Sequence, residues 1–147
     1  VTDQGILRKD YVHLGMAVDT PSGLIVPVIR DADLLRLTEL SACATELAQK
    51  AKNGKLTPAE YTGSSFTVSN LGMFGLECFV PILNTPESGI LGVGKIEKQP
   101  VVINNEIVIR PMMCLTLTYD HRVTDGAPAA QFLARVKQYL ENPYLLL

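Results

Sequence analysis

A strand that runs into a helix through a short polar turn is the feature that most constrains this chain. The apolar run 112–117 is typical of a strand, and apolar residues recur at helical spacing after residue 127. The segment 118–126, with the sequence TYDHRVTDG, connects the two and places His121 on the turn. A histidine in such a turn is often purely structural. Because loops between regular elements tend to carry chemistry, His121 is nevertheless a candidate general base.

The composition describes a globular domain without electrostatic partners. The chain has 147 residues, of which 47% are hydrophobic and 19% charged, which suits one domain with a sizeable core. The formal net charge is −2, and no run of like charges occurs. We therefore expect no nucleic acid partner and no anionic membrane partner. No apolar run approaches the roughly 20 residues of a membrane span.

The cysteines favour neither a disulfide nor a metal. Cys43, Cys78 and Cys114 are odd in number and widely spaced, and they lack a Cys-x-x-Cys pattern or a nearby histidine. We expect three buried free thiols in a reducing compartment, and no metal site. The first residues resemble neither a signal peptide nor a transit peptide, so we expect a soluble protein whose leader, if any, has been removed.

The N-terminal part predicts a β-hairpin. Two β-rich runs, 11–18 and 24–29, flank the turn-forming segment 19–23 (DTPSG). Pro27 cannot donate a ladder hydrogen bond, so its strand lies at an edge or contains a bulge. His13 has no carboxylate or second histidine at ligand spacing, and we interpret it as a packed or surface residue.

Two amphipathic helices are predicted to pack on a sheet. The first ends near Gly54 and carries one apolar stripe: Leu37, Leu40, Ala44, Leu47, Ala48 and Ala51. Thr57 and Pro58 are typical of the cap and first position of a one-turn helix. The second long helix spans about 127–140, with a predicted buried stripe of Ala129, Phe132, Leu133, Val136 and Leu140.

Three single strands and a hairpin are predicted between the helices. In residues 65–69, apolar side chains alternate with hydroxyl-bearing ones, and hydroxyl side chains in a strand ordinarily just face the solvent. Residues 79–83 are predicted to form a strand, and residues 89–94 a closely packed one, since their glycines do not fit the dinucleotide-binding spacing. Runs 101–103 and 107–109 flank an Asn-Asn-Glu turn and predict a hairpin.

Two motifs resemble one enzyme family. The His-x-x-x-Asp-Gly pattern from His121 to Gly126 resembles the active-site signature shared by dihydrolipoamide acyltransferases and chloramphenicol acetyltransferase. Residues 67–72 (TVSNLG) resemble the second motif of the acyltransferase catalytic domain, and Ser69 lies 52 positions before His121 in the expected order. The resemblance covers residues 11–147. It implies an α/β fold of the chloramphenicol-acetyltransferase type, a mixed sheet with helices packed on one side.

The resemblance also implies roles for the site residues. His121 would take a proton from a thiol, and Ser69 would donate a hydrogen bond to the oxyanion of the tetrahedral intermediate. Asp125 is either a catalytic acid or, as we favour, a residue that caps the helix or pairs with a basic residue to orient the histidine turn. Coenzyme A, as acetyl-CoA, and a lipoyl group are the implied substrates, with no metal. The residues that bind coenzyme A cannot be named from the sequence.

Assembly and extent follow from the same resemblance. Members form homotrimers with active sites at subunit boundaries, and the trimers build cubic or dodecahedral cores that work with lipoyl domains, a decarboxylase and dihydrolipoamide dehydrogenase. The apolar tail 144–147 would dock on another trimer. Members usually carry further residues before Tyr11. We therefore expect residues 1–147 to be the C-terminal part of a catalytic domain truncated at its N-terminus, without a lipoyl or peripheral-subunit-binding domain.

The acyl group is less constrained. Val123, together with residues 71–75 and 84–87, resembles the acetyltransferases of pyruvate and acetoin complexes more than succinyltransferases. A branched-chain acyltransferase and a non-catalytic scaffold fragment of the core stay open as alternatives. The family works in the bacterial cytoplasm or the mitochondrial matrix, and we expect one of these locations.

Overall fold

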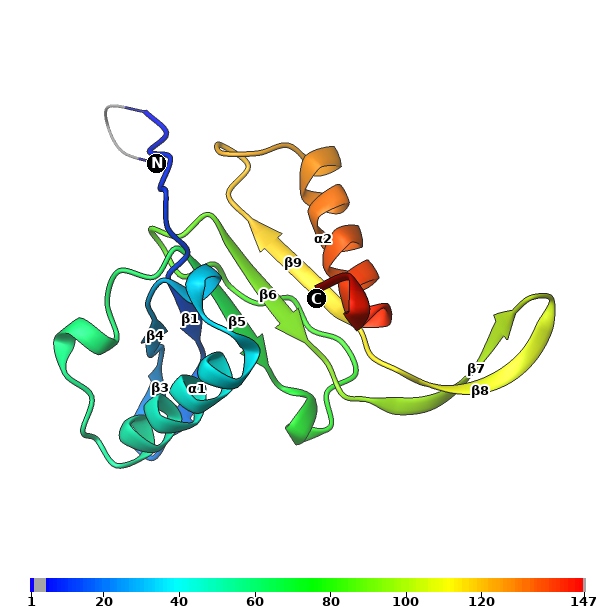
Figure 1. The fold of residues 1–147 in the computed structure, drawn as a ribbon, viewed down its shortest axis with the longest axis horizontal. Coiled ribbons are helices and arrows are strands. Elements are labelled where there is room, and N and C mark those ends of the chain that lie inside the picture. The colour runs from blue at the N-terminus through cyan, green and yellow to red at the C-terminus, as the bar shows by residue number, and fades with distance from the viewer. Residues whose placement is uncertain (2–4, 147) are drawn as a thin grey trace.

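A five-stranded mixed sheet forms the centre of the molecule (Figure 1). The computed structural model describes Val1 and residues 5–146. The strand order is β4-β1-β5-β6-β9; β1, β5 and β6 run parallel, while β4 and β9 are antiparallel to their neighbours. The strands are β1 (Leu14–Met16), β4 (Val28–Ile29), β5 (Phe66–Asn70), β6 (Gly89–Val93) and β9 (Leu115–Tyr119).

The predicted N-terminal hairpin forms, but it divides between two sheets. β2 (Val18–Thr20) and β3 (Gly23–Ile25) pair as a separate ribbon, while β1 and β4 belong to the central sheet. Pro27 lies between β3 and the edge strand β4, and its carbonyl accepts the Met16 N–H at 2.9 Å. The edge position predicted for this proline-bearing segment is therefore confirmed, and the lost donor of Pro27 does not interrupt the sheet interior.

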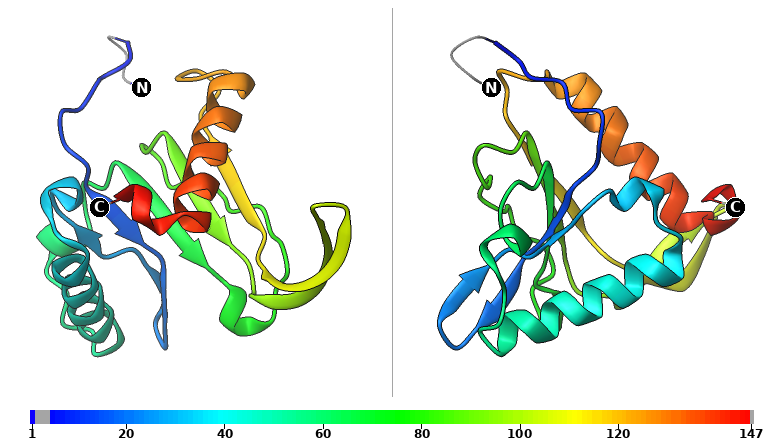
Figure 2. Two further views of the ribbon diagram at one scale, coloured as in Figure 1. Left: turned by 45° about the vertical axis from the view of Figure 1, so that its right-hand side comes forward. Right: turned by 60° about the vertical axis from the view of Figure 1, so that its left-hand side comes forward.

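The two long helices lie on the same side of the central sheet (Figure 2). α1 (Leu37–Lys52) contacts β2 and β4 at one end of the sheet, and α2 (Gly126–Glu141) contacts β9 at the other. Leu47, Ala51 and Ala129 are buried beneath them. The prediction of a buried stripe on α2 is wrong for Phe132 and Leu140, which are about half exposed, because α2 covers the edge strand and only part of its apolar face meets β9.

Short 3-10 helices connect these elements. The predicted one-turn helix after Thr57 is confirmed: Thr57 and Glu60 form a reciprocal capping box around η2. In the described part of the chain the 3-10 helices are η1 (Ala32–Leu34), η2 (Pro58–Glu60), η3 (Gly72–Phe74) and η4 (Pro143–Leu146).

The segment before β6 does not form the predicted strand at 79–83. It runs irregularly across β6, where the hydroxyls of Thr116 and Thr118 each donate a hydrogen bond of 2.6 Å, to the carbonyls of Phe79 and Pro81. Gly94 allows this approach, since a Cβ there would collide with the Glu77 carbonyl. The close packing predicted for the glycines of 89–94 is thus confirmed, and side-chain hydroxyls replace strand pairing in the segment above them.

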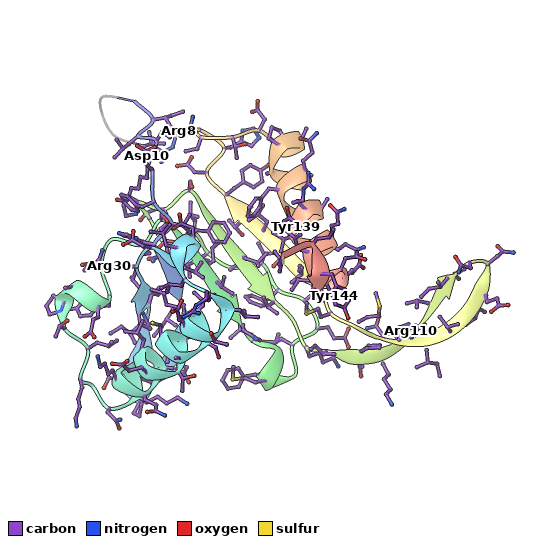
Figure 3. All side chains as sticks on the ribbon, viewed as in Figure 1. Arg8, Asp10, Arg30, Arg110, Tyr139 and Tyr144 are labelled. Atoms are coloured by element: carbon purple, nitrogen blue, oxygen red, sulfur yellow. A yellow bond between two sulfur atoms is a disulfide. The ribbon has the colours of Figure 1, made fainter. Side chains whose placement is uncertain are left out.

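The second predicted hairpin is longer than its sequence signal. β7 (Glu97–Ile103) and β8 (Glu106–Met112) form a ribbon that projects from the body; Arg110 on β8 marks it in Figure 3. Asn104 and Asn105 have φ angles of 52° and 67°, the left-handed conformation that a two-residue hairpin turn requires. Large apolar side chains of the ribbon are exposed: Val102, Ile107 and Ile109.

The sulfurs of Cys78 and Cys114 are bonded to each other, with Cα atoms 5.5 Å apart. The prediction of three buried free thiols is therefore wrong for this pair; Cys43 is free as predicted, but it is only partly buried. The irregular segment brings Glu77, the residue before Cys78, over Gly94, whose N–H donates to the Cys114 carbonyl at 2.9 Å; the sequence spacing does not reveal this proximity. Among the described residues, no helix is long and apolar enough to cross a membrane.

Candidate active site

The turn that carries His121 is fixed through its neighbour Asp120. β9 ends at Tyr119, and the Asp120 N–H donates a 2.9 Å hydrogen bond to the Ser88 carbonyl, which precedes β6. The Asp120 carbonyl in turn accepts the N–H groups of Val123 at 2.9 Å and Thr124 at 3.3 Å. The backbone on both sides of the histidine is therefore held by hydrogen bonds to ordered structure.

A side-chain ion pair reinforces the same turn. Arg122 donates from Nε (3.0 Å) and Nη2 (2.7 Å) to the two carboxylate oxygens of Asp120, and its own backbone N–H donates to Oδ1 at 2.9 Å. The side-chain and then the backbone hydrogen bond from Arg122 lower the pKa of Asp120 to about 2. This bidentate pair straddles His121 in the sequence and restricts the turn to one conformation. The sequence analysis did not predict this pair.

His121 projects from this turn beside Asp125. The distance from His121 Nδ1 to Asp125 Oδ1 is 3.5 Å, and 70% of the histidine side chain is exposed. Asp125 is the N-cap residue of α2, and its carbonyl accepts the Ala129 N–H at 3.2 Å, but its carboxylate makes no capping hydrogen bond. The acid is therefore directed to the imidazole rather than to the helix end. An acceptor beside Nδ1 favours the tautomer that leaves Nε2 free to accept a proton.

Ser69 lies at the other end of the sheet. It occupies β5 opposite Gly92 of β6, and Gly92 lies opposite Thr116 of β9. Within the described part of the chain, the Ser69 hydroxyl has no hydrogen-bond partner, so it is available as a donor. The strand β5 positions it through parallel pairing on both sides, with β1 and β6.

The sheet register separates Ser69 from His121. Two strand spacings put Ser69 about 10 Å from Thr116, and Tyr119 is about 10 Å further along β9, with the histidine two residues beyond it. The residues that the sequence singled out are thus in two places: His121 and Asp125 together at one end of the sheet, and Ser69 alone at the other. One chain does not bring His121 and Ser69 into a single site.

Apolar space adjoins the histidine turn. A cavity of about 280 Å³ lies between the end of β9 and the start of α2, lined on its floor by Phe66, Tyr119 and Phe132. A larger one of about 610 Å³ lies along the second half of α2, lined by Met112, Met113, Leu133 and Leu140. Sequence patterns predicted neither, because both form where α2 leaves part of its apolar face uncovered.

Within the described ranges no group of three or more His, Cys, Asp or Glu side chains could hold a metal ion.

Comparison with known proteins gives a consistent picture. The family model described as "2-oxoacid dehydrogenases acyltransferase (catalytic domain)" matches residues 1–147. The chain is 53% identical over 135 residues to the dihydrolipoyllysine-residue acetyltransferase component of the pyruvate dehydrogenase complex of Mycoplasma capricolum, covering 92% of the chain and 31% of that protein. It is 50% identical to the corresponding component of the acetoin cleaving system of Bacillus subtilis, covering 99% and 36%.

Succinyltransferases are nearly as similar. The dihydrolipoyllysine-residue succinyltransferase component of the 2-oxoglutarate dehydrogenase complex of Rickettsia felis is 46% identical over 142 residues, covering 97% of the chain and 35% of that protein. The chain thus spans about a third of the length of these curated relatives.

A solved structure shares the fold. The dihydrolipoamide acetyltransferase of Azotobacter vinelandii superposes with a TM-score of 0.93 at 48% identity, over 98% of this chain and 60% of that one. That structure addresses the catalytic role of a serine, of a histidine 52 positions later, and of an asparagine four positions after the histidine. Ser69, His121 and Asp125 have the same two spacings.

Proposed function

The chain belongs to the family of 2-oxoacid dehydrogenase acyltransferase catalytic domains, and we propose that it transfers an acetyl group between dihydrolipoamide and coenzyme A. The observation that carries this proposal is the pair of spacings from Ser69 to His121 and from His121 to Asp125, which match those of the three residues studied in the Azotobacter acetyltransferase. The ordered turn around His121 supports a catalytic role, since a base must be held in place before substrate arrives.

The geometry of the turn suggests how the reaction proceeds. His121 Nε2 removes the proton from the thiol of coenzyme A or dihydrolipoamide, and the thiolate attacks the carbonyl carbon of the acyl thioester. The Ser69 hydroxyl donates a hydrogen bond to the resulting oxyanion. Collapse of the tetrahedral intermediate breaks the other carbon–sulfur bond, and the departing thiolate takes the proton back from the imidazolium. Asp125 beside Nδ1 stabilises the imidazolium between these steps.

The site is completed by a second copy of the chain in this proposal. Ser69 and His121 occupy opposite ends of the sheet, so the base of one chain meets the hydroxyl of its neighbour when copies associate in a ring. A homotrimer with three such boundaries would place every active site at a subunit contact. The cubic core of a pyruvate dehydrogenase multienzyme complex, whose chain superposes on this one with a TM-score of 0.93, supports such an assembly.

The partners follow from the reaction. Lipoyl domains would deliver and remove the acyl group, a decarboxylase would load it, and dihydrolipoamide dehydrogenase would reoxidise the lipoyl group. The exposed apolar side chains of the projecting β7–β8 ribbon and of the C-terminal segment support a contribution to a larger core. A purely structural role in that core is the second candidate function, favoured by the same exposed surfaces.

One assay separates the two candidates and addresses the acyl group. Transfer to dihydrolipoamide is measured with acetyl-, isobutyryl- and succinyl-CoA, on this chain and on a form extended at its N-terminus. We expect acetyl-CoA to have the highest kcat/KM, because Val123 and residues 84–87 follow the acetyltransferase pattern. One methylene in an apolar pocket changes selectivity by about 10–200-fold, so a true preference is readily measured. Absence of transfer with all three donors in both forms would leave only the structural role.

A further inference from the structure

Glu87 is a buried carboxylate that accepts three side-chain hydrogen bonds. Only 4% of the residue is exposed. Asn84 Nδ2 and Thr67 Oγ1 each donate to the carboxylate at 2.6 Å, and the Ser64 hydroxyl donates to the same oxygen as Asn84. An acid is costly to bury unless such donors surround it. The donors come from Ser64 and Thr67 at the start of β5 and from the loop 84–88 itself, so the carboxylate fastens that loop to the central sheet.

A glycine on the neighbouring strand leaves room for one of these hydrogen bonds. The Thr67 hydroxyl is fully buried, and it lies over Gly15 of β1, where a Cβ would come within 2.5 Å of Oγ1. A glycine at position 15 therefore leaves the room that the Thr67 hydroxyl needs to reach Glu87. Residues from β1, β5 and the loop before β6 converge on one carboxylate.

The network reaches the histidine turn in two steps along the backbone. Ser88 follows Glu87, and its carbonyl accepts the Asp120 N–H at 2.9 Å. His121 is the next residue. Ser64, Glu87 and Ser88 also line the same cavity of about 340 Å³ as Val123 of the histidine turn. The loop held by Glu87 thus also holds the end of β9, through the Ser88 carbonyl. The position of the His121 imidazole depends on this contact.

We propose that Glu87 is a positioning residue for His121: it fixes the loop 84–88 on β5, so that the Ser88 carbonyl holds Asp120 and sets where the imidazole projects. This inference rests on the proposed function of His121 as the base, but its structural step, from Glu87 to the Asp120 N–H, is independent of activity. Glu87 acts through its hydrogen-bond geometry and makes no contact with the reacting atoms.

The test compares Glu87→Ala and Glu87→Gln with wild type and with Leu47→Ala, a control that opens the core under α1, away from the turn. We expect Glu87→Ala to lower kcat by at least about 10-fold with KM within about 2-fold, because a small misplacement of the base slows the proton transfer. Glu87→Gln keeps one acceptor oxygen, and the Thr67 hydroxyl can turn to accept from its amide. Its kcat should stay within about 3-fold of wild type.

Hydrogen exchange by NMR gives the readout that does not need activity. In Glu87→Ala the Asp120 amide should exchange at least about 10-fold faster, while the Lys95 amide, bound to the Leu76 carbonyl at 2.8 Å, keeps its rate. In Leu47→Ala the ratio of the Asp120 and Lys95 amide exchange rates should equal that of wild type. The kcat should be unchanged at temperatures below the unfolding transition. Gly15→Ala, which displaces the Thr67 hydroxyl, should reproduce the Asp120 effect and serves if Glu87→Ala does not fold.

The outcomes separate the two claims. An unchanged Asp120 exchange rate in Glu87→Ala and Gly15→Ala overturns the positioning role, and so does a kcat loss in Leu47→Ala equal to that in Glu87→Ala. A wild-type protein that transfers no acyl group contradicts the proposed function, while faster exchange at Asp120 still supports the link from Glu87 to the turn.

Discussion

Ser69 and His121 lie at opposite ends of one sheet, because β5 runs antiparallel to β9 with β6 between them. The end of β9 that leads to His121 lies at the same end of the sheet as the start of β5, whereas Ser69 is the fourth residue of that five-residue strand. The strand register thus separates two residues that act in the same proposed reaction. In the proposed reaction, a site that contains both residues would form between two copies of the protein.

Substitution of the two residues should cost different amounts. His121→Ala removes the base, and general base catalysis contributes about 10²–10⁴-fold. Ser69→Ala removes one oxyanion donor, worth about 10²–10³-fold. We expect both variants to keep the wild-type thermal midpoint, since the His121 side chain is mostly exposed and the Ser69 hydroxyl has no partner in the described chain. Steady-state kinetics with acetyl-CoA measures both; near-wild-type rates in both would refute the assignment.

Mixing the two inactive variants should restore activity. In a mixed assembly, a site is intact when the chain that supplies His121 carries Ser69→Ala and the neighbour that supplies Ser69 carries His121→Ala. After joint refolding of equal amounts, about a quarter of the wild-type rate should return, because each site draws its two residues independently. Mixing without dissociation is the control and should give no recovery. Failure to recover after verified subunit exchange would place both residues in a site of a single chain.

Asp125 should orient the imidazole rather than react. Its carboxylate is 3.5 Å from His121 Nδ1 and makes no cap to α2. Asp125→Asn keeps an acceptor oxygen, and the Azotobacter enzyme has an asparagine with this spacing. We expect Asp125→Asn to retain activity within about 10-fold, and Asp125→Ala to lose more, because only the alanine removes the acceptor beside Nδ1. Complete loss in Asp125→Asn with an unchanged thermal midpoint would instead indicate that the acid itself transfers a proton.

The Asp120–Arg122 ion pair should keep the protein folded to a lower pH. The hydrogen bonds from Arg122 lower the pKa of Asp120 to about 2, so the folded state gains stability above the ordinary pKa of an aspartate and loses it as the pH falls towards 2. Arg122→Met should raise the Asp120 pKa, measured by carboxyl NMR, and raise the pH midpoint of acid unfolding. Lys137→Met breaks an exposed pair with Glu141 on α2 and should leave both values unchanged. An Asp120 pKa that stays near 2 in Arg122→Met would contradict the role of the guanidinium.

Local patterns in the sequence predicted the elements whose causes are local. The Asn104–Asn105 turn was recognised because left-handed backbone at two positions selects asparagine, and α1 because its apolar residues repeat at helical spacing. The sequence does not reveal the irregular path of 79–83, because this path depends on threonine hydroxyls 37 residues away that donate hydrogen bonds to its carbonyls.

The candidate site was predictable only in part for the same reason. Motifs identified Ser69, His121 and Asp125, but the sheet register that separates the serine from the histidine is a property of tertiary pairing. The support from Glu87 was also missed: an acid in a polar loop carries no sign that three donors from β5 and its own loop will enclose it.

The C-terminal segment should couple trimers into a larger particle. Tyr144, Leu145 and Leu146 in η4 follow α2 and are 84%, 55% and 65% exposed, so the chain does not bury them itself. Burial of a large aliphatic side chain is worth about 1.5–3 kcal/mol, which favours a pocket on a neighbour; paired contacts across a two-fold axis would close a shell. Deletion of residues 144–147 should therefore leave trimers while it abolishes the larger core, as measured by light scattering. Leu24→Ser on β3 is the matched control for a lost apolar surface outside this segment, because the Leu24 side chain is 73% exposed and belongs to no proposed contact, and it should keep the particle mass. An unchanged mass after the deletion, or a wild-type chain that is monomeric at micromolar concentration, would refute the docking role.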